Sequence, residues 1–308
     1  MKTRYFVSFS VPRSEGDRVK GYIKDIGLIE FWEDPHNERA LPHMYHTLDG
    51  DDPKLAALRA LLKREGIEWS EREEHVYTDA ELRSFPFLEL YVEREPLDRT
   101  SLQYGTTYDL SKACPACGTG AIQTSPLMVP LSGFPKKGLV CAGFDGETLV
   151  GPPLIEALQA GDVKGLELRQ VRFYRNDEPL PWWQMIASFE MPRMSPKTRG
   201  GITDETDYLT EEGFVIPAHP PCPRCRRDGR YHSDEPYEIA YSRRDVDPAA
   251  VPDVAHKWES FGVSGVDKEK PEFSRFGDHR LLVKPKVFDI FRRLRVRQAC
   301  FVPVRIVD

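Results

Sequence analysis

The sequence lacks any run of about 18 or more apolar residues, the length that a helix needs to cross a bilayer. Its first residues, Met1–Arg4, are partly basic, but the segment after them alternates polar and apolar side chains instead of forming the apolar core of a signal peptide. We therefore predict a cytoplasmic protein with no membrane partner, whose chain begins with a β-strand.

The common catalytic motifs are also missing. The sequence holds no G-x-G-x-x-G, no G-x-x-x-x-G-K-[ST], no H-E-x-x-H and no G-x-S-x-G. Nor is positive charge in excess, since 43 Lys and Arg residues stand against 49 Asp and Glu residues, for a formal net charge of −6. These absences predict that the protein is not an enzyme, and they argue against a protein that coats nucleic acid.

Cysteine is scarce, but its spacing is informative. Four of the six cysteines form two C-x-x-C pairs, Cys114/Cys117 and Cys222/Cys225. Each pair can fold as a knuckle that presents two sulfurs to one ion, and two knuckles complete a tetrahedral four-thiolate zinc shell. A redox dithiol would need a helix directly after one pair, and neither pair is followed by a helical pattern. We predict one structural Zn²⁺ held by all four cysteines.

The distance between the two pairs is unusual. Residues 118–221, 104 residues in all, separate them, whereas the knuckles of a zinc ribbon usually lie about 15–20 residues apart. Either a long insertion lies between the knuckles or each pair belongs to its own site. A closed four-cysteine site leaves no open position for water or substrate, so we expect the metal to stabilise the fold and to take no part in catalysis.

The length of 308 residues favours two units in an α+β fold. Residues 1–102 are predicted to form a small α+β unit of βαββ character, and residues 103–308 a zinc-clasped unit. Asp52 and Pro53 mark the start of an amphipathic helix that ends near Gly66. The other predicted elements of the first unit are strands at 4–11, 68–77 and 87–93 and a helix at 15–26.

The zinc-binding unit contains an internal similarity. Residues 148–174 align with residues 281–307 without a gap, at an offset of 133 positions. Both segments predict a strand, a helix led by a proline, and a second strand. This pattern indicates two similar strand–helix–strand segments, each downstream of one cysteine pair, and it is compatible with either an internal duplication or convergence on one β-α-β pattern.

Several weaker features have a structural interpretation as well as a functional one. A basic tip of the second knuckle (Arg224, Arg226, Arg227 and Arg230) would suit a zinc-ribbon module that contacts nucleic acid or regulates another process, which is the alternative function. Asp34, His36, Glu38, His43 and His46 do not match the spacing of a metal motif and are predicted to be a solvated loop. Trp182 and Trp183 are predicted to pack in a core.

The cysteine motifs carry a family resemblance. Cys114-Pro-Ala-Cys117-Gly118, Cys222-Pro-Arg-Cys225 and the ending Phe301-Val-Pro-Val304 resemble the bacterial double-CXXCG family, whose members are placed beside polymorphic toxins as zinc-binding immunity proteins. In this chain the second pair is followed by Arg226 instead of glycine. The resemblance implies a non-catalytic protein whose partner is a cognate protein toxin that it binds and neutralises.

Overall fold

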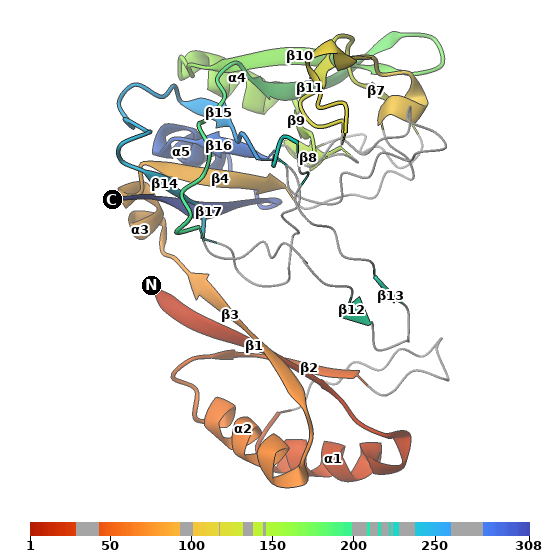
Figure 1. Ribbon diagram of the computed structural model, residues 1–308, viewed down its shortest axis with the longest axis vertical. Coiled ribbons are helices and arrows are strands. Elements are labelled where there is room, and N and C mark those ends of the chain that lie inside the picture. Colours follow the sequence, from red (N-terminus) through yellow and green to blue (C-terminus); the bar gives the residue numbers. More distant parts are fainter. Residues whose placement is uncertain are drawn as a thin grey trace. The chain divides into compact units, whose positions relative to one another are not determined.

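The computed structural model describes residues 1–28, 43–92, 101–116, 118–131, 138–143, 146–198, 208–209, 215–216, 222, 224–227, 238–259 and 280–308. The fold is mixed α+β, as predicted, with five α-helices and several sheets in this part of the chain (Figure 1). Two compact units are present, the first built mainly on Met1–Glu81 and the second mainly on Leu82–Tyr208 and Tyr237–Asp308. No helix among the described residues is long and apolar enough to span a membrane.

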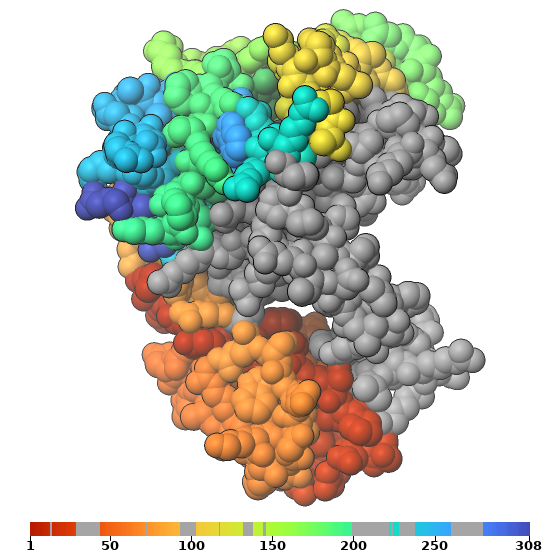
Figure 2. Space-filling view, in the orientation of Figure 1, coloured from red at the N-terminus to blue at the C-terminus, as the bar shows by residue number. Residues whose placement is uncertain are grey.

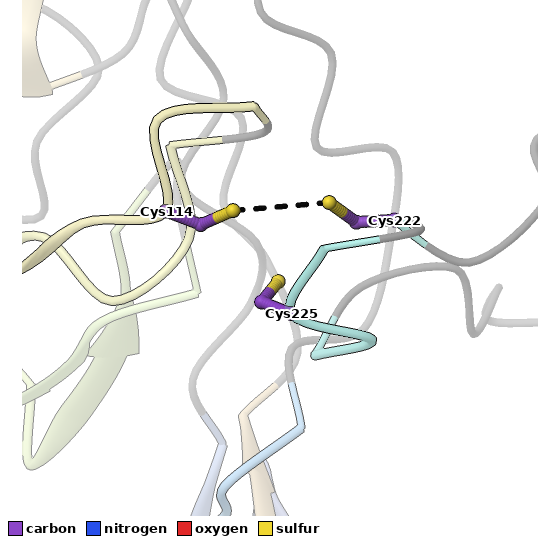
Figure 3. A group of neighbouring side chains, drawn as sticks. All are labelled: Cys114, Cys222 and Cys225. Carbon is purple, nitrogen blue, oxygen red and sulfur yellow. Dashed lines mark hydrogen bonds between the residues drawn. The ribbon is translucent and has the colours of Figure 1, made fainter.

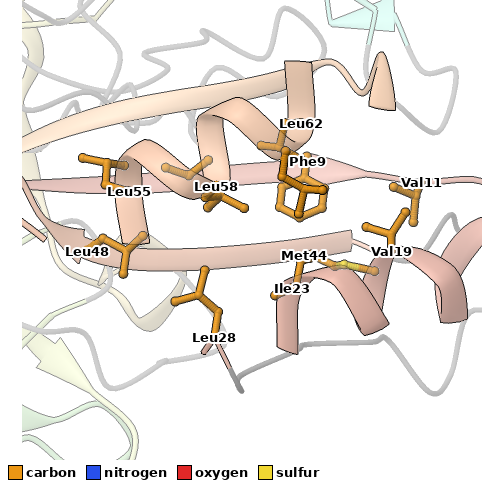
Figure 4. Packing of buried hydrophobic residues seen from close by; sticks show 12 residues of the cluster. Phe9, Val11, Val19, Ile23, Leu28, Met44, Leu48, Leu55, Leu58 and Leu62 are labelled. Carbon is orange, nitrogen blue, oxygen red and sulfur yellow. The ribbon is translucent and has the colours of Figure 1, made fainter. Parts of the chain in front are cut away.

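Unit 1 is a three-stranded antiparallel sheet of order β2-β1-β3, covered by two helices. Its elements are β1 (Lys2–Ser10), α1 (Arg13–Asp25), β2 (His43–Asp49), α2 (Pro53–Glu65) and β3 (Trp69–Val76). Val7 and Phe9 of β1 lie in one buried cluster with leucines of α2, including Leu58 and Leu62 (Figure 4). The alternation of β1 therefore places its apolar residues under the helices.

Helix α2 has the boundaries that its sequence predicts. The Asp52 side chain accepts a hydrogen bond of 2.9 Å from the backbone N–H of Lys54, Pro53 occupies the first turn, and Gly66 ends the helix with a φ of 68°. A left-handed residue after the last turn is a usual helix stop, and glycine adopts it without a steric penalty. The predicted apolar face is also confirmed, since these leucines are buried: Leu55, Leu58, Leu61 and Leu62.

The predicted βαββ order of the first unit is wrong in two respects. Strand β2, which the sequence did not predict, pairs with β1 from Arg4↔Asp49 to Ser10↔His43. In addition, the strand predicted at 87–93 is β4 (Phe87–Val92), which belongs to a sheet of unit 2. The contact boundary thus falls after Glu81 instead of at residue 102. Pairing between distant strands decides where β4 lies, and local pattern does not reveal it.

Unit 2 contains two five-stranded sheets, of order β7-β10-β11-β9-β8 and β14-β17-β4-β16-β15. The first sheet comprises β7 (Met128–Val129), β8 (Val140–Ala142), β9 (Thr148–Val150), β10 (Leu166–Phe173) and β11 (Glu178–Ala187), with helix α4 (Pro152–Ala160). The second comprises β4, β14 (Ala240–Ser242), β15 (Val254–His256), β16 (Leu281–Val283) and β17 (Ala299–Val307), with helix α5 (Pro285–Arg293).

Shorter elements complete the description. A helix, α3 (Asp79–Ser84), leads into β4, and two-stranded sheets are formed by β5 (Tyr108–Asp109) with β6 (Ile122–Gln123) and by β12 (Tyr208–Leu209) with β13 (Val215–Ile216). Two 3-10 helices are η1 (Ser101–Tyr104) and η2 (Leu110–Lys112). Trp182 is 2% exposed in the core of the first sheet, so it packs as predicted.

The two similar strand–helix–strand segments are confirmed. β9, α4 and β10 each begin 133 positions before β16, α5 and β17. Pro152 and Pro285 occupy the first turn of their helices, where the missing N–H has no intrahelical partner to lose. Asp162 (φ 49°) and Arg295 (φ 55°) follow the two helix ends in the same left-handed conformation. The segments therefore share their helix starts and stops.

The two sheets also share one strand order. In each, the repeated strands flank a central antiparallel strand, which is β11 in the first sheet and β4 in the second. The outer neighbours match too, because β7 is parallel to β10 as β14 is parallel to β17. The second sheet thus takes its central strand, β4, from a much earlier part of the chain than its other strands.

Candidate metal centre

Three of the four predicted cysteine ligands converge in unit 2. The sulfurs of Cys114, Cys222 and Cys225 all lie within 4.8 Å of one another, and those of Cys114 and Cys222 are 3.8 Å apart. Figure 3 shows the three side chains directed toward one point. Cys114 and Cys222 are buried, and Cys225 is half-buried. Cys117 lies outside the described residues, so its predicted role stays a prediction.

The spacing of the sulfurs suits a shared ion. Four sulfurs placed about 2.3 Å from a tetrahedral zinc ion are about 3.8 Å from one another, whereas a disulfide holds its sulfurs about 2.05 Å apart. No disulfide joins any two of the described cysteines. The cluster is therefore compatible with a metal ion such as zinc, and a cysteine of the first pair reaches the same place as both cysteines of the second.

Both knuckles are built on the same backbone turn. The N–H of Gly118 donates to the carbonyl of Cys114 at 2.7 Å, and the N–H of Arg226 donates to the carbonyl of Cys222 at 2.9 Å. Gly118 has a φ of 76° and Arg226 a φ of 56°. Arg226 occupies the position that Gly118 has in the first knuckle and adopts the same left-handed conformation.

Further hydrogen bonds hold each knuckle. In the first, the N–H of Cys114 donates to the carbonyl of Thr119 at 2.8 Å, next to the β5–β6 pair. In the second, the N–H of Arg227 lies 3.4 Å from the sulfur of Cys225 and donates to it. Donors aimed at a sulfur stabilise its thiolate form, which is the form that binds a metal.

The cysteine cluster brings together equivalent positions of the two halves of unit 2, where each half is one knuckle with the strand–helix–strand segment that follows it. The first knuckle precedes β7, β8, β9, α4 and β10, and the second precedes β14, β15, β16, α5 and β17. Helices α4 and α5 are in contact with each other. In Figure 2 the turquoise surface of residues 224–227 lies beside the yellow surface of the first-knuckle segment. One ion at this place would connect both halves of unit 2.

The basic tip of the second knuckle is not a uniform free surface. Arg224 and Arg226 are exposed, whereas Arg227 donates from both terminal nitrogens to the carboxylate of Glu190, at 3.2 and 3.3 Å. Its guanidinium also lies over the ring of Trp258, 5.0 Å from the centroid. Arg230 lies outside the described residues. Arg227 is thus engaged within the fold, which weakens the nucleic-acid alternative.

The histidine group forms no described metal cluster. The predicted solvated loop is wrong for His46, which is a buried residue of β2 whose ring lies 6.4 Å from that of Phe9 in unit 1. Among the described residues the only group with metal-ligand spacing is the cysteine cluster. The remaining members of the histidine group (Asp34, His36, Glu38 and the side chain of His43) lie outside the described residues.

A buried ion pair at the central strand of the second sheet was not predicted from the sequence. The ammonium of Lys257 donates to the carboxylate of Glu89 at 2.5 Å, and both side chains are 0% exposed. Arg280 approaches the same carboxylate at 3.6 Å. The signal was present, because Glu89 is the one charged residue of the apolar strand Phe87–Val92. A buried carboxylate in such a strand needs a cationic partner.

Comparisons with protein-family models, with curated proteins and with solved structures found no match to this chain. The resemblance of its cysteine motifs to the double-CXXCG family therefore stays a prediction.

Proposed function

We propose that this protein is a non-catalytic binding protein held together by one structural Zn²⁺, with Cys114, Cys117, Cys222 and Cys225 as ligands. The observation that carries the metal assignment is that two knuckles with the same backbone turn bring three sulfurs within 4.8 Å of one another. Two of these sulfurs, those of Cys114 and Cys222, lie 3.8 Å apart, which is the spacing of tetrahedral zinc ligands. Cys117, two residues beyond Pro115 in the same knuckle, supplies the fourth ligand.

The metal in this proposal has a structural role. Four thiolates fill a tetrahedral shell and leave no position for water or substrate. Structural zinc contributes its binding energy to folding, and values of about 10–16 kcal/mol are known for small zinc-finger peptides. A fraction of that energy is enough to fix the two knuckles, and the halves that follow them, in one arrangement. A reducing cytoplasm suits such a site because it keeps the cysteines reduced.

The proposed partner is a cognate bacterial toxin, which the protein binds and neutralises as an immunity protein. Two features support this choice: the resemblance of the cysteine motifs and the placement of acidic charge. Residues 1–81 contain 17 Asp and Glu residues but only 12 Lys and Arg residues, so most of the net negative charge lies in unit 1. An acidic unit suits a basic partner, such as a toxin that acts on nucleic acid, because complementary charge speeds association.

Metal content tests the first part of the proposal. Elemental analysis of protein purified without added metal should give about one zinc per chain, as four thiolates bind one ion. Cys114→Ser and Cys222→Ser should each lose the zinc and lower the melting temperature. Cys300→Ser, at an exposed position of β17, is the matched control and should keep the zinc and the melting temperature of the unchanged protein. Full zinc retention in both knuckle variants would rule out the shared site.

Co-expression tests the second part. The product of the neighbouring gene should arrest growth when expressed alone, and this protein should restore growth and purify with it as a complex. A neighbouring product that is harmless alone would contradict the immunity role. Neutralising acidic residues of unit 1 should slow formation of the complex and thereby weaken the rescue of growth, since electrostatic steering depends on charge.

The exposed Arg224 and Arg226 favour a second candidate, a zinc-ribbon module that contacts nucleic acid. Such contacts release counterions, so binding to nonspecific DNA or RNA should fall steeply as salt rises. Absence of binding at low salt would exclude this candidate and would leave the toxin-binding proposal untouched.

A further inference from the structure

Arg227 connects the second knuckle to the body of unit 2. Its backbone N–H donates to the sulfur of Cys225 at 3.4 Å, and its guanidinium holds Glu190 through two hydrogen bonds and covers Trp258. The Nη1 atom also lies 3.4 Å from the position that a β-carbon on Gly120 would take. One side chain of the second knuckle therefore contacts two residues outside the metal centre and lies close to Gly120, just after the first knuckle.

The partners of Arg227 are themselves firmly attached. Glu190 forms a parallel β-bridge with His256, and two backbone hydrogen bonds of 2.9 Å connect His256 with Phe189 and Met191. Trp258 stands between residues whose side chains turn inward, because Lys257 pairs with Glu89 of β4 and Glu259 accepts the N–H of Met194 at 2.8 Å. Residues 256–259 thus link the knuckle to the central strand of the second sheet.

We propose that Arg227 is the positioning residue of the metal centre, and that it couples metal binding to the order of residues 256–259. This inference rests on the proposed zinc site. A ligand that is held in place before the ion arrives loses less entropy on binding, and groups outside the ligand shell commonly change metal affinity about 10–100-fold when removed. Arg227 orients the loop directly after Cys225 and so pre-arranges that sulfur.

Arginine is the residue type that this position needs. Its planar guanidinium can donate two parallel hydrogen bonds to one carboxylate while its face stacks on an indole, and a lysine ammonium can do only one of these at a time. Arg224 and Arg226 belong to the same knuckle and have exposed side chains with no ion pair in the described part of the chain. They have the same charge without the contacts, and Arg224 therefore makes a matched control.

The test compares the full-length Arg227→Ala, Arg227→Lys and Arg224→Ala variants with the unchanged protein. Zinc dissociation constants come from competition with a chromophoric chelator, and amide exchange is followed at residues 254–259 in zinc-saturated protein. Arg227→Ala should weaken zinc binding about 10–100-fold and speed exchange at 256–259. Arg227→Lys should show smaller changes than Arg227→Ala in zinc affinity and in amide exchange, but should not match the unchanged protein. The zinc dissociation constant of Arg224→Ala should stay within about threefold of that of the unchanged protein, since this variant loses only surface charge.

Glu190→Gln keeps the size of the side chain and removes its charge, and it provides a second route if Arg227→Ala does not fold. It should weaken zinc binding in the same direction by a smaller factor. Unchanged affinity and unchanged exchange in Arg227→Ala, or equal losses in Arg224→Ala, would overturn the inference while the zinc site stands. A protein that binds no zinc in its unchanged form would instead refute the proposed function.

Discussion

Arg226 in the second knuckle takes the left-handed backbone conformation that Gly118 takes in the first, with φ angles of 56° and 76°. Each residue directly follows the second cysteine of its pair, and each donates its N–H to the carbonyl of the first cysteine. The turn is therefore imposed by the knuckle and not by glycine, and Arg226 bears the steric cost of its β-carbon.

The two positions should respond to substitution in opposite directions. Arg226→Gly should raise the free energy of unfolding by roughly 0.5–1 kcal/mol, because the relief of a left-handed β-carbon outweighs the added flexibility of the unfolded chain. Gly118→Ala should lower it by about 1 kcal/mol. Urea denaturation of zinc-loaded protein measures both. A loss of stability in Arg226→Gly would show that its side chain has a contact that outweighs the strain.

Removal of the proposed zinc ion should affect unit 2 selectively. The cysteine cluster lies in unit 2, and unit 1 has a separate core of residues from β1, β2, α1 and α2. Treatment with a zinc chelator should therefore speed amide exchange in β14–β17 while β1–β3 keep their protection. Restoring zinc should restore the original pattern. Equal loss of protection in both units would mean that unit 1 depends on the metal as well.

The buried pair of Lys257 and Glu89 should be costly to break from one side. Lys257→Met leaves the Glu89 carboxylate buried without the ammonium that donates to it, and it should lower the free energy of unfolding by roughly 3–5 kcal/mol. Adding Glu89→Leu to that variant should recover part of the loss. Lys286→Met is the control, because its ion pair with Asp253 is half-exposed and worth at most about 1 kcal/mol. Chemical denaturation of the three variants gives the comparison.

Unit 1 should lose stability in acid partly through Glu71. The Arg59 guanidinium donates to this carboxyl and holds its pKa below the usual value of 4.5. A lowered folded-state pKa contributes stability that is present above pH 4.5 and is lost as the pH falls below it, toward the folded-state pKa. Glu71→Gln should therefore flatten the dependence of unfolding free energy on pH in this acidic range, and Glu68→Gln, at an exposed position, should not.

Much of the local structure follows from the sequence. The Asp52–Gly66 helix, the two proline-led helices and the offset of 133 positions were predictable because caps, glycine stops and apolar periodicity act over a few residues. The two cysteine knuckles could be predicted for the same reason, since a C-x-x-C knuckle is one local turn. Strand β2 was not predicted, because seven residues of mixed polarity give a weak alternating signal.

Only the tertiary structure decided how these pieces combine. The sequence determined that two cysteine pairs and two strand–helix–strand segments exist, but 108 positions separate Cys114 from Cys222, and no local signal states that they meet. Nor does it state that β4 fills the place in the second sheet that β11 fills in the first. Such pairings depend on which distant surfaces bury each other best, and that balance belongs to the whole fold.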